Sequence, residues 1–288
     1  MRITTPIAVA LTLAAGLLAQ PAATLPPAAV PMWQLRSKHF AYGMPVPIDA
    51  RHQVARPNGR VMPGISVLVK EGFAVGHYDK FKVPAWVCTR WTEGDYRRSE
   101  AEPYNARDFK EDDELPNYAV GGTNLDHATS GMQRGHMARQ EDNKAWGSDN
   151  VDEGCEMSNI VPQSAAMNNG TWNELEEEHR RVVANPASGI KAIWIINGPI
   201  FKTDAPKTVG KGIAVPDACY KLIGWFDGNS RFIVRAYVMS QTDTRRGVRN
   251  YLTTVDAVEQ ATGLDFFADL PEDVENPLEA ERAIEPWR

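Results

Sequence analysis

The chain has 288 residues, with 31 Lys and Arg against 37 Asp and Glu, which gives a formal net charge of −6 at pH 7. Hydrophobic residues make up 43% of the sequence and charged residues 24%, which is ordinary for a soluble protein with one sizeable core. The negative balance excludes a protein that coats nucleic acid by bulk positive charge, although local clusters of arginine can still hold phosphates.

The N-terminal residues have the pattern of a signal peptide. Arg2 precedes an apolar run at residues 7–18, and small residues follow near Ala23. The run is too short to span a membrane, so we expect export to the periplasm or the medium and no membrane attachment of the mature form. A buried N-terminal helix is the alternative. The expected organisation is a signal peptide at residues 1–23, a Pro/Ala-rich linker at residues 24–40 and one globular domain at residues 41–288.

Apolar runs rich in β-branched residues predict the first strands. Residues 65–69 and 73–77, which a short turn joins, predict a hairpin. Residues 84–91 predict a further strand, and its alternation puts Trp86 and Arg90 on one face. Arg90 thus shares a face with a residue type that tends to be buried, which indicates a charge directed at a specific partner.

The rest of the chain mixes strands and helices in an irregular order. Residues 101–132 are polar and predict a loop. The turn at residues 227–230 favours an antiparallel pair of strands around it. This order predicts an α+β fold, with a central antiparallel sheet flanked by helices, rather than a doubly wound parallel sheet. The predicted strands lie at residues 192–197, 218–225 and 231–239, and the predicted helices at residues 172–184 and 254–262.

The three cysteines are Cys88, Cys155 and Cys219. An odd number in an exported protein leaves at least one thiol free or paired between chains, and it allows at most one internal disulfide. The sequence does not choose that pair. The spacing contains no CxxC motif, which argues against a zinc site.

One histidine and a row of polar residues form the strongest chemical pattern. His136 suits proton transfer near neutral pH. Asn168 and Glu176 offer oxygen ligands for a hard cation such as Mg²⁺. Asn168, Trp172, Glu176 and Arg180 step by four, which places them along one side of a helix. Nearby arginines suit phosphate. This combination predicts metal-assisted cleavage of a phosphodiester.

Several segments carry the pattern of a known family. Residues 133–136 read QRGH, residues 158–163 read SNIVPQ and residues 168–176 read NNGTWNELE. In order and spacing, these segments resemble the DNA/RNA non-specific endonuclease family, and the likeness extends over roughly residues 40–270. Its further parts are residues 194–201 (WIINGPIF), Val215-Pro216 with Lys221, and residues 255–267 (VDAVEQATGLDFF).

One position departs from the family's pattern. The family usually has an acidic residue before the arginine, whereas this chain has Gln133. A neutral amide can form hydrogen bonds but adds no negative charge next to a metal site. We therefore expect the site to differ from the family at this position, without loss of activity.

The resemblance implies a nuclease domain that cuts DNA and RNA with little sequence preference, around a ββα-metal motif. It implies His136 as general base, Asn168 as the direct Mg²⁺ ligand and Glu176 as the acid that holds the metal's water. Mn²⁺ or another divalent cation is the alternative metal. By the same likeness, Arg90 and Arg134 contact phosphate and the transition state. The predicted substrate-binding residues are Arg180, Asn159 and Gln163.

Each of these residues has an alternative role. Asn168 could be an ordinary helix N-cap, and Glu176 could lie on a solvated helix face. Arg180 could pair with Glu176 instead of phosphate. Asn159 and Gln163 could brace the loop that bears them instead of binding substrate.

Two other functions remain open. The same residues could serve a phosphodiesterase that acts on small nucleotides, or the chain could be a binding module that has kept the fold without catalysis. The presence of His136, Asn168 and Glu176 argues against the binding module, because binding needs no such set. A homodimer and an inhibitor protein are further partners on which the sequence is silent.

Overall fold

The computed structural model describes residues 38–48, 64–103, 107–115, 130–242, 247–283 and 287, all within one unit that spans Pro31–Arg288. The predicted signal peptide at residues 1–23 lies outside the described residues, as does all of the predicted linker except residues 38–40. The domain start at residue 41 stays a prediction. Among the described residues, no helix has the length and hydrophobicity that a membrane crossing requires.

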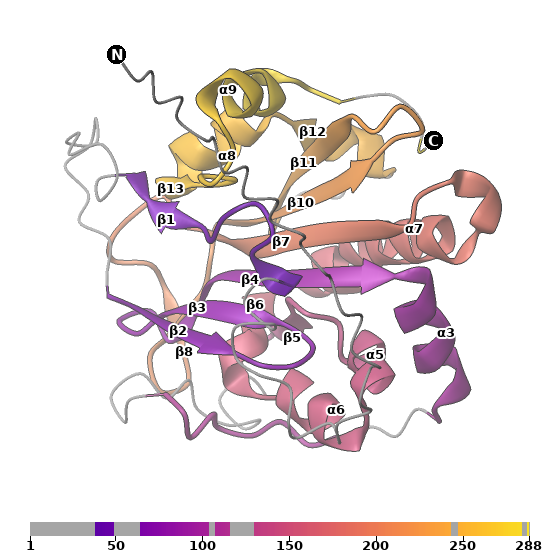
Figure 1. Ribbon diagram of the computed structural model, residues 1–288. Helices are drawn as coiled ribbons and strands as arrows, with labels where there is room; N and C mark the ends of the chain where they lie inside the picture. The colour runs from indigo at the N-terminus through magenta and orange to yellow at the C-terminus, as the bar shows by residue number, and fades with distance from the viewer. Residues whose placement is uncertain are drawn as a thin grey trace, which may run out of the picture. The chain divides into compact units, whose positions relative to one another are not determined.

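A seven-stranded sheet runs through the unit, and every neighbouring pair of its strands is antiparallel (Figure 1). The strand order is β12-β11-β10-β7-β4-β3-β2. The sheet strands are β2 (Ile65–Val69), β3 (Ala74–Tyr78), β4 (Val83–Thr92), β7 (Ala192–Ile200), β10 (Ala218–Phe226), β11 (Phe232–Ser240) and β12 (Leu252–Thr253). The predicted hairpin, the predicted strand at residues 84–91 and the three later strands are therefore confirmed, with ends that differ by up to three residues.

Three short strand pairs lie outside this sheet. They are β1 (Val46–Pro47) with β13 (Leu264–Asp265), β5 (Gln133–His136) with β6 (Ile160–Gln163), and β8 (Thr208–Val209) with β9 (Ile213–Ala214). The pair β5–β6 falls where the sequence contains the histidine motif. Its strands are antiparallel, with His136 opposite Ile160.

The helices are set by local signals that the sequence shows in part. They are α3 (Glu93–Ala101), α5 (Gln140–Asn143), α6 (Ser148–Gly154), α7 (Asn173–Ala184), α8 (Val255–Thr262) and α9 (Glu272–Ala280). The Thr254 side chain caps α8, and Gly263 ends it in the left-handed conformation at φ 68°, as glycine after a helix does. Helix α3 was not predicted, although Thr92 and Asp95 form a reciprocal capping box at its start.

The predicted helix at residues 172–184 differs from expectation at its N-terminal end. Regular α-helix begins only at Asn173, and residues 167–172 before it form a π-helical segment, η4 (Met167–Trp172). Gly170 interrupts this segment with φ −100° and ψ −116°. Asn168 therefore lies before the regular helix, so the step-of-four row from Asn168 to Arg180 is not one continuous α-helical stripe.

The two faces of the sheet are covered by different helices, as successive residues of β10 show. The Tyr220 ring packs 5.5 Å from the ring of Phe266, just after α8, whereas the Lys221 amine reaches Glu176 on α7. Neighbouring residues of a strand point to opposite faces. Helix α8 therefore lies on one face of the sheet and α7 on the other (Figure 1). Helix α9 contacts both α8 and β11, so it covers the same face as α8.

The described core lies on both sides of the sheet and includes the fully buried side chains of Trp86, Trp172 and Trp225. Cys88, Cys155 and Cys219 are all buried and free, so none of them forms the one internal disulfide that their number would permit. Burial raises the pKa of the Cys219 thiol to about 12, which keeps this thiol protonated and unreactive at neutral pH.

Gly198, in the central strand β7, tests how tightly the sheet is packed. It lies opposite Tyr220, whose hydroxyl donates to the Ala85 carbonyl at 3.1 Å, and an added methyl group would overlap both of these groups. We expect Gly198→Ala to lower the free energy of unfolding by about 1–3 kcal/mol, because this core cannot relax around it. Chemical denaturation measures the change. Gly228→Ala, in an open turn, is the matched control, and equal stability of both variants would contradict the packing argument.

Candidate active site

Strands β5 and β6 and the helical segment after them form the framework of the site. His136 is the last residue of β5, and η4 begins four residues after β6 ends. The Met137 amide continues the pairing by donating to the Asn159 carbonyl at 3.0 Å. This order of strand, strand and helix matches the ββα arrangement that the resemblance implies, although α5 and α6 lie in the connection between the strands.

The side chain of Gln163 leaves no room for any side chain at residue 135, so this position must be glycine. A methyl group at Gly135 would overlap the Gln163 amide, which lies directly against the glycine. Gln163 is fully buried, and its Nε2 lies 3.5 Å from the Cys219 sulfur on β10. The structure therefore gives Gln163 the bracing role, because its amide ties the β5–β6 pair to the large sheet and has no exposed surface for substrate.

Asn159 also braces the chain beside His136. It is fully buried, its Oδ1 accepts from the Ala138 amide at 2.7 Å, and its Nδ2 donates to the carbonyls of Ala138 and Gly154 at 2.8 Å each. These three bonds fix the backbone directly after the histidine. Asn159 therefore braces the loop that bears it, and its predicted contact with substrate stays a prediction.

Asn168 is held by the residue that departs from the family's pattern. Its Nδ2 donates to Gln133 Oε1 at 2.9 Å, which joins η4 to the start of β5. Within the described part of the chain, no hydrogen bond reaches its Oδ1 oxygen. The alternative N-cap role of Asn168 is not found. The residue before η4 is Ala166, and the side chain that accepts from the first amide of η4 is that of Ser164, whose Oγ lies 3.3 Å from the Met167 nitrogen.

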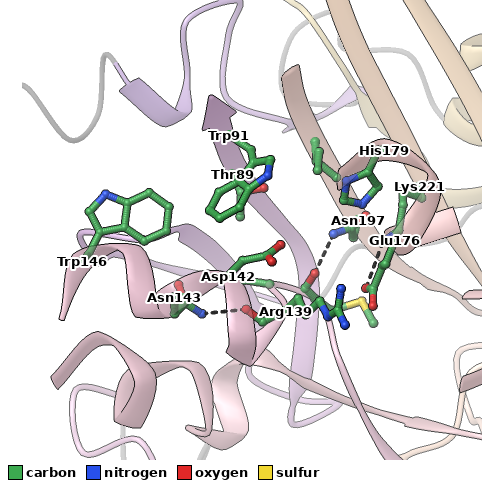
Figure 2. A pocket seen from close by; sticks show the side chains of 14 residues that line it. Thr89, Trp91, Arg139, Asp142, Asn143, Trp146, Glu176, His179, Asn197 and Lys221 are labelled. Atoms are coloured by element: carbon green, nitrogen blue, oxygen red, sulfur yellow. Dashed lines mark hydrogen bonds and ion pairs between the residues drawn. The ribbon is translucent and has the colours of Figure 1, made fainter. Parts of the chain in front are cut away.

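Side chains from β5, η4 and α7 line an open pocket of about 430 Å³, which includes His136, Asn168, Trp172 and Glu176. Glu176 is only 7% exposed, so the alternative of a solvated helix face is excluded. Its Oε1 accepts from the Lys221 amine at 3.2 Å (Figure 2). That amine lies 4.1 Å from the centre of the Trp172 ring. A separate cavity of about 20 Å³ behind Glu176, with Asn197 and His179 at its wall, is too small for a nucleotide.

His136 has surroundings that keep its imidazole neutral. Burial, with the nearby positive charges of Arg134 and Arg139, lowers the pKa of His136 to about 4. The Phe109 ring packs 5.2 Å from the imidazole, and Nε2 has no hydrogen-bond partner among the described residues. A neutral ring with an uncommitted nitrogen is the form that can accept a proton.

The arginines around the pocket differ in how far carboxylates neutralise them. Arg139 pairs with Glu141 at 2.8 Å and with Glu177 at 2.7 Å. Arg134 lies with its guanidinium 4.2 Å from the Phe109 ring centre, and no described carboxylate pairs with it. Because Arg134 and His136 leave β5 on the same face, Arg134 is an available cation beside the histidine.

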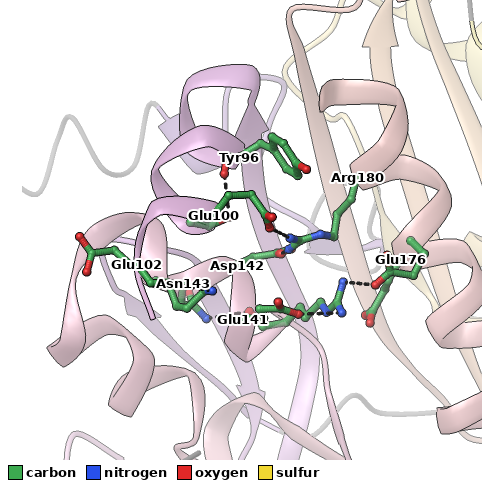
Figure 3. A network of polar contacts seen from close by, with 12 residues as sticks. Tyr96, Glu100, Glu102, Glu141, Asp142, Asn143, Glu176 and Arg180 are labelled. Carbon is green, nitrogen blue, oxygen red and sulfur yellow. Dashed lines mark hydrogen bonds and ion pairs between the residues drawn. The ribbon is translucent and has the colours of Figure 1, made fainter. Parts of the chain in front are cut away.

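Arg180 is held away from the pocket by two carboxylates. Its guanidinium pairs with Asp142 and, at 2.9 Å, with Glu100, and the whole residue is only 5% exposed (Figure 3). The predicted partner Glu176 pairs instead with Lys221. Arg180 therefore helps to fix α3 and α5 against α7, and substrate binding would require it to leave both carboxylates.

Comparison with known proteins identifies the family to which this chain belongs. Residues 55–273 match the family described as DNA/RNA non-specific endonuclease. The chain belongs to this family. The match covers the large sheet, the β5–β6 pair and the whole described pocket, so the endonuclease is a phosphodiester hydrolase of this class.

Relatives of the endonuclease include mitochondrial and bacterial nucleases. Mitochondrial endonuclease G of Bos taurus is 27% identical over 226 residues, which cover 73% of this chain and 72% of that protein. The nuclease of Serratia marcescens is 32% identical over 136 residues, 45% of this chain and 49% of that one. The solved EndoG/EndoGI complex contains a chain with TM-score 0.68 and 22% identity, over 87% of this chain and 95% of that chain, and this likeness shows the fold.

Arg90 does not line the endonuclease's pocket. The pocket face of β4 carries Thr89 and Trp91, which line the small cavity behind Glu176. Arg90 points to the other face, where its guanidinium lies 5.6 Å from the centre of the Trp194 ring. The alternation of the strand was predicted correctly, but alternation alone does not tell which face the active site uses.

Three residues of the site were not assigned from the sequence: Phe109, Arg139 and Lys221. Lys221 offered a signal, because a lysine within the otherwise apolar strand β10 must find a buried partner. Burial lowers the pKa of Lys221, which Glu176 counteracts by holding the charged form. Phe109 and Arg139 offered no comparable signal, since their contacts with His136 and Glu177 arise only in the folded chain.

The lowered pKa of His136 predicts the acid limit of activity. The neutral imidazole predominates above pH 4, so we expect kcat/KM to persist from pH 7 to about pH 5 and to fall as the pH drops through about 4. Initial rates on plasmid DNA measure the profile, and circular dichroism at each pH confirms that the enzyme is folded. A midpoint near 6.5, the ordinary histidine value, would show that the surroundings of His136 do not depress its pKa.

Proposed function

We propose that the endonuclease hydrolyses DNA and RNA with little sequence preference, with a divalent cation as cofactor and His136 as general base. The observation that carries this proposal is that His136, Asn168 and Glu176 line one open pocket of about 430 Å³. The family supplies the reaction class. The assignment of roles to these three residues rests on their chemistry and on their meeting in that pocket.

The residues at the pocket fit a hard cation. The Asn168 carbonyl oxygen has no hydrogen-bond donor among the described residues, because its amide nitrogen is the group that contacts Gln133. Glu176 adds a carboxylate in the same pocket. Oxygen ligands of this kind, few in number, suit Mg²⁺, which usually keeps several waters. We propose Mg²⁺, held directly by Asn168 and through water by Glu176; when bound, the cation would stabilise the negative charge that develops on the phosphate.

Besides the metal ion, hydrolysis requires a base for the attacking water and a cation for the phosphate, and His136 and Arg134 would supply them. A neutral His136 can take a proton from the attacking water, because its Nε2 has no described hydrogen-bond partner. Arg134, which no described carboxylate neutralises, would attract the phosphate to the same side of β5. Phe109 packs against both the His136 imidazole and the Arg134 guanidinium, and so keeps the base and the cation side by side.

The cellular setting of the enzyme is a proposal that rests on the sequence. We propose that residues 1–23 direct export to the periplasm or the medium and that the nuclease domain begins near residue 41. Both proposals rest on the apolar run at residues 7–18 and the Pro/Ala-rich segment after it. A homodimer and an inhibitor protein stay predictions.

Digestion of supercoiled plasmid and of RNA tests the proposed function. With Mg²⁺ we expect both to be cut, and we expect His136→Ala to lower the rate by about 10²–10⁴-fold while circular dichroism shows an intact fold. Arg90→Ala, on the other face of the sheet, is the matched control and should retain the wild-type rate. Intact plasmid with Mg²⁺ would overturn the proposal, and an unchanged rate for His136→Ala would overturn the role of the histidine.

The Gln133–Asn168 hydrogen bond predicts a difference between two substitutions. Gln133→Ala removes the acceptor that orients Asn168, so we expect the affinity for Mn²⁺ or Mg²⁺ to fall by about 10-fold or more. Gln133→Asp keeps an acceptor and adds a negative charge, so its affinity should equal or exceed that of the wild type. Isothermal titration calorimetry without substrate measures both, and wild-type affinity in Gln133→Ala would show that the bond does not orient the ligand.

A further inference from the structure

Arg139 places a guanidinium at the wall of the active-site pocket. It is the residue before α5 and follows His136 closely in the chain. It lines the open pocket of about 430 Å³ that also contains His136 and Asn168. Burial is the main cause of the lowered pKa of His136, and the positive charges of Arg134 and Arg139 add to it. A phosphate that reaches His136 and Asn168 therefore comes near the Arg139 guanidinium as well.

Two carboxylates from different helices pair with this guanidinium. Glu141 on α5 lies 2.8 Å from Nη2, and Glu177 on α7 lies 2.7 Å from Nη1. We call Arg139, Glu141 and Glu177 the Arg139 bridge. Arg139 lines the active-site pocket, Glu177 lines a neighbouring open pocket of about 360 Å³, and Glu141 lines both. The bridge therefore lies on the border between the two pockets.

The ion pairs of the Arg139 bridge can be exchanged at low cost. The side chains of Glu141 and Glu177 are 34% and 44% exposed, and that of Arg139 is 20% exposed. Ion pairs that water reaches contribute little, because water and salt screen the two charges. In addition, Nη1 of Arg139 forms no hydrogen bond with any described residue, although Glu177 lies close to it. The bridge thus leaves the guanidinium incompletely bonded, and another anion can take the place of its carboxylates.

Arg180, on the same helix as Glu177, has the opposite environment. Its side chain is 6% exposed, and its guanidinium donates hydrogen bonds to both Asp142 and Glu100 (Figure 3). The Asp142 side chain is itself only 15% exposed. Breaking such a pair leaves buried charges without partners, which is strongly unfavourable. Of these two arginines, Arg139 is therefore the one that can change partners when an anion enters the pocket.

We propose that Arg139 binds a phosphate of the substrate strand, and that this phosphate displaces Glu141 and Glu177 from the guanidinium. The inference rests on the proposed function, because it takes a nucleic acid as the ligand of the pocket. A phosphodiester offers the guanidinium two oxygens in nearly the same geometry as a carboxylate, so one anion can replace the other. The two carboxylates hold Arg139 in place in the free enzyme and compete with the substrate for it. They thereby set the affinity for nucleic acid below the value that the arginine alone would give.

The salt dependence of DNA binding tests the phosphate contact. Fluorescence anisotropy with a short labelled DNA duplex, in EDTA, gives Kd over a range of KCl concentrations, and a His136→Ala background prevents cleavage. Each phosphate contact releases about one counterion from DNA, so we expect Arg139→Gln to raise Kd and to reduce the slope of log Kd against log [KCl] by about 1. Arg139→Lys keeps the positive charge and should keep most of the slope, which a purely structural role would not require.

Removing the two competing carboxylates tests the displacement. In the same assay we expect Glu141→Gln with Glu177→Gln to lower Kd by about 3–10-fold, the value of two exposed ion pairs. Without the Arg139 charge, the same two substitutions should do no more than a control pair. That control is Asp149→Asn with Glu174→Gln, which removes two exposed charges from α6 and α7 that form no ion pair among the described residues.

The outcomes separate the contact from general electrostatics and from the proposed function. An unchanged salt slope in Arg139→Gln would overturn the phosphate contact. An equal gain in affinity with and without the Arg139 charge would overturn the displacement, because Glu141 and Glu177 would then act only by repelling DNA. Circular dichroism of every variant shows that it is folded, and Arg139→Lys keeps the bridge testable if the neutral variant unfolds. Plasmid digestion by the enzyme with His136 intact is measured separately, so failure of the nuclease function is distinct from failure of this contact.

Discussion

The buried ion pair between Lys221 and Glu176 is the constraint on which the geometry of the active site depends. The two side chains are 1% and 9% exposed, and their charged atoms lie 3.2 Å apart. A buried charge that loses its partner destabilises a protein by several kcal/mol, so α7 can dock on β10 only with the carboxylate over the amine. The Trp172 ring, 4.1 Å from the amine, covers the pair from the η4 side. The position of Glu176 in the pocket is thereby fixed by the central sheet and not by the helix alone.

Much of the fold could be predicted because its signals are local. The long strands of the large sheet are mostly apolar, with many β-branched and aromatic residues, and Thr254 and Gly263 mark both ends of α8. Helix α3 could not be separated from β4, because its polar sequence follows the strand without a break and only the Thr92 capping box marks its start. The π-helical turn at Gly170 likewise departs from any regular period, so the sequence predicted a straight helix there.

The pocket could be predicted in part, and the limit is set by contacts between distant residues. His136, Asn168 and Glu176 meet as their motifs indicated, although their chemical roles stay predictions. The ion pairs of Arg180 could not be predicted, because its partners, Asp142 and Glu100, are 38 and 80 residues away and come from other helices. Such pairings depend on how helices pack, and no pattern within a single sequence records them.

The distribution of paired and unpaired charge explains how an acidic protein can act on a polyanion. Carboxylates pair with Arg139 and Arg180, so these residues fasten α5 and α7 together, although Arg139 still helps to lower the pKa of His136. Arg134 has no such partner among the described residues and lies against Phe109. The attraction for phosphate is then confined to the side of β5 where His136 ends the strand. The net charge of −6 belongs to the whole chain, and those of its carboxylates that lie more than about 10 Å from the pocket are largely screened at 0.1 M salt.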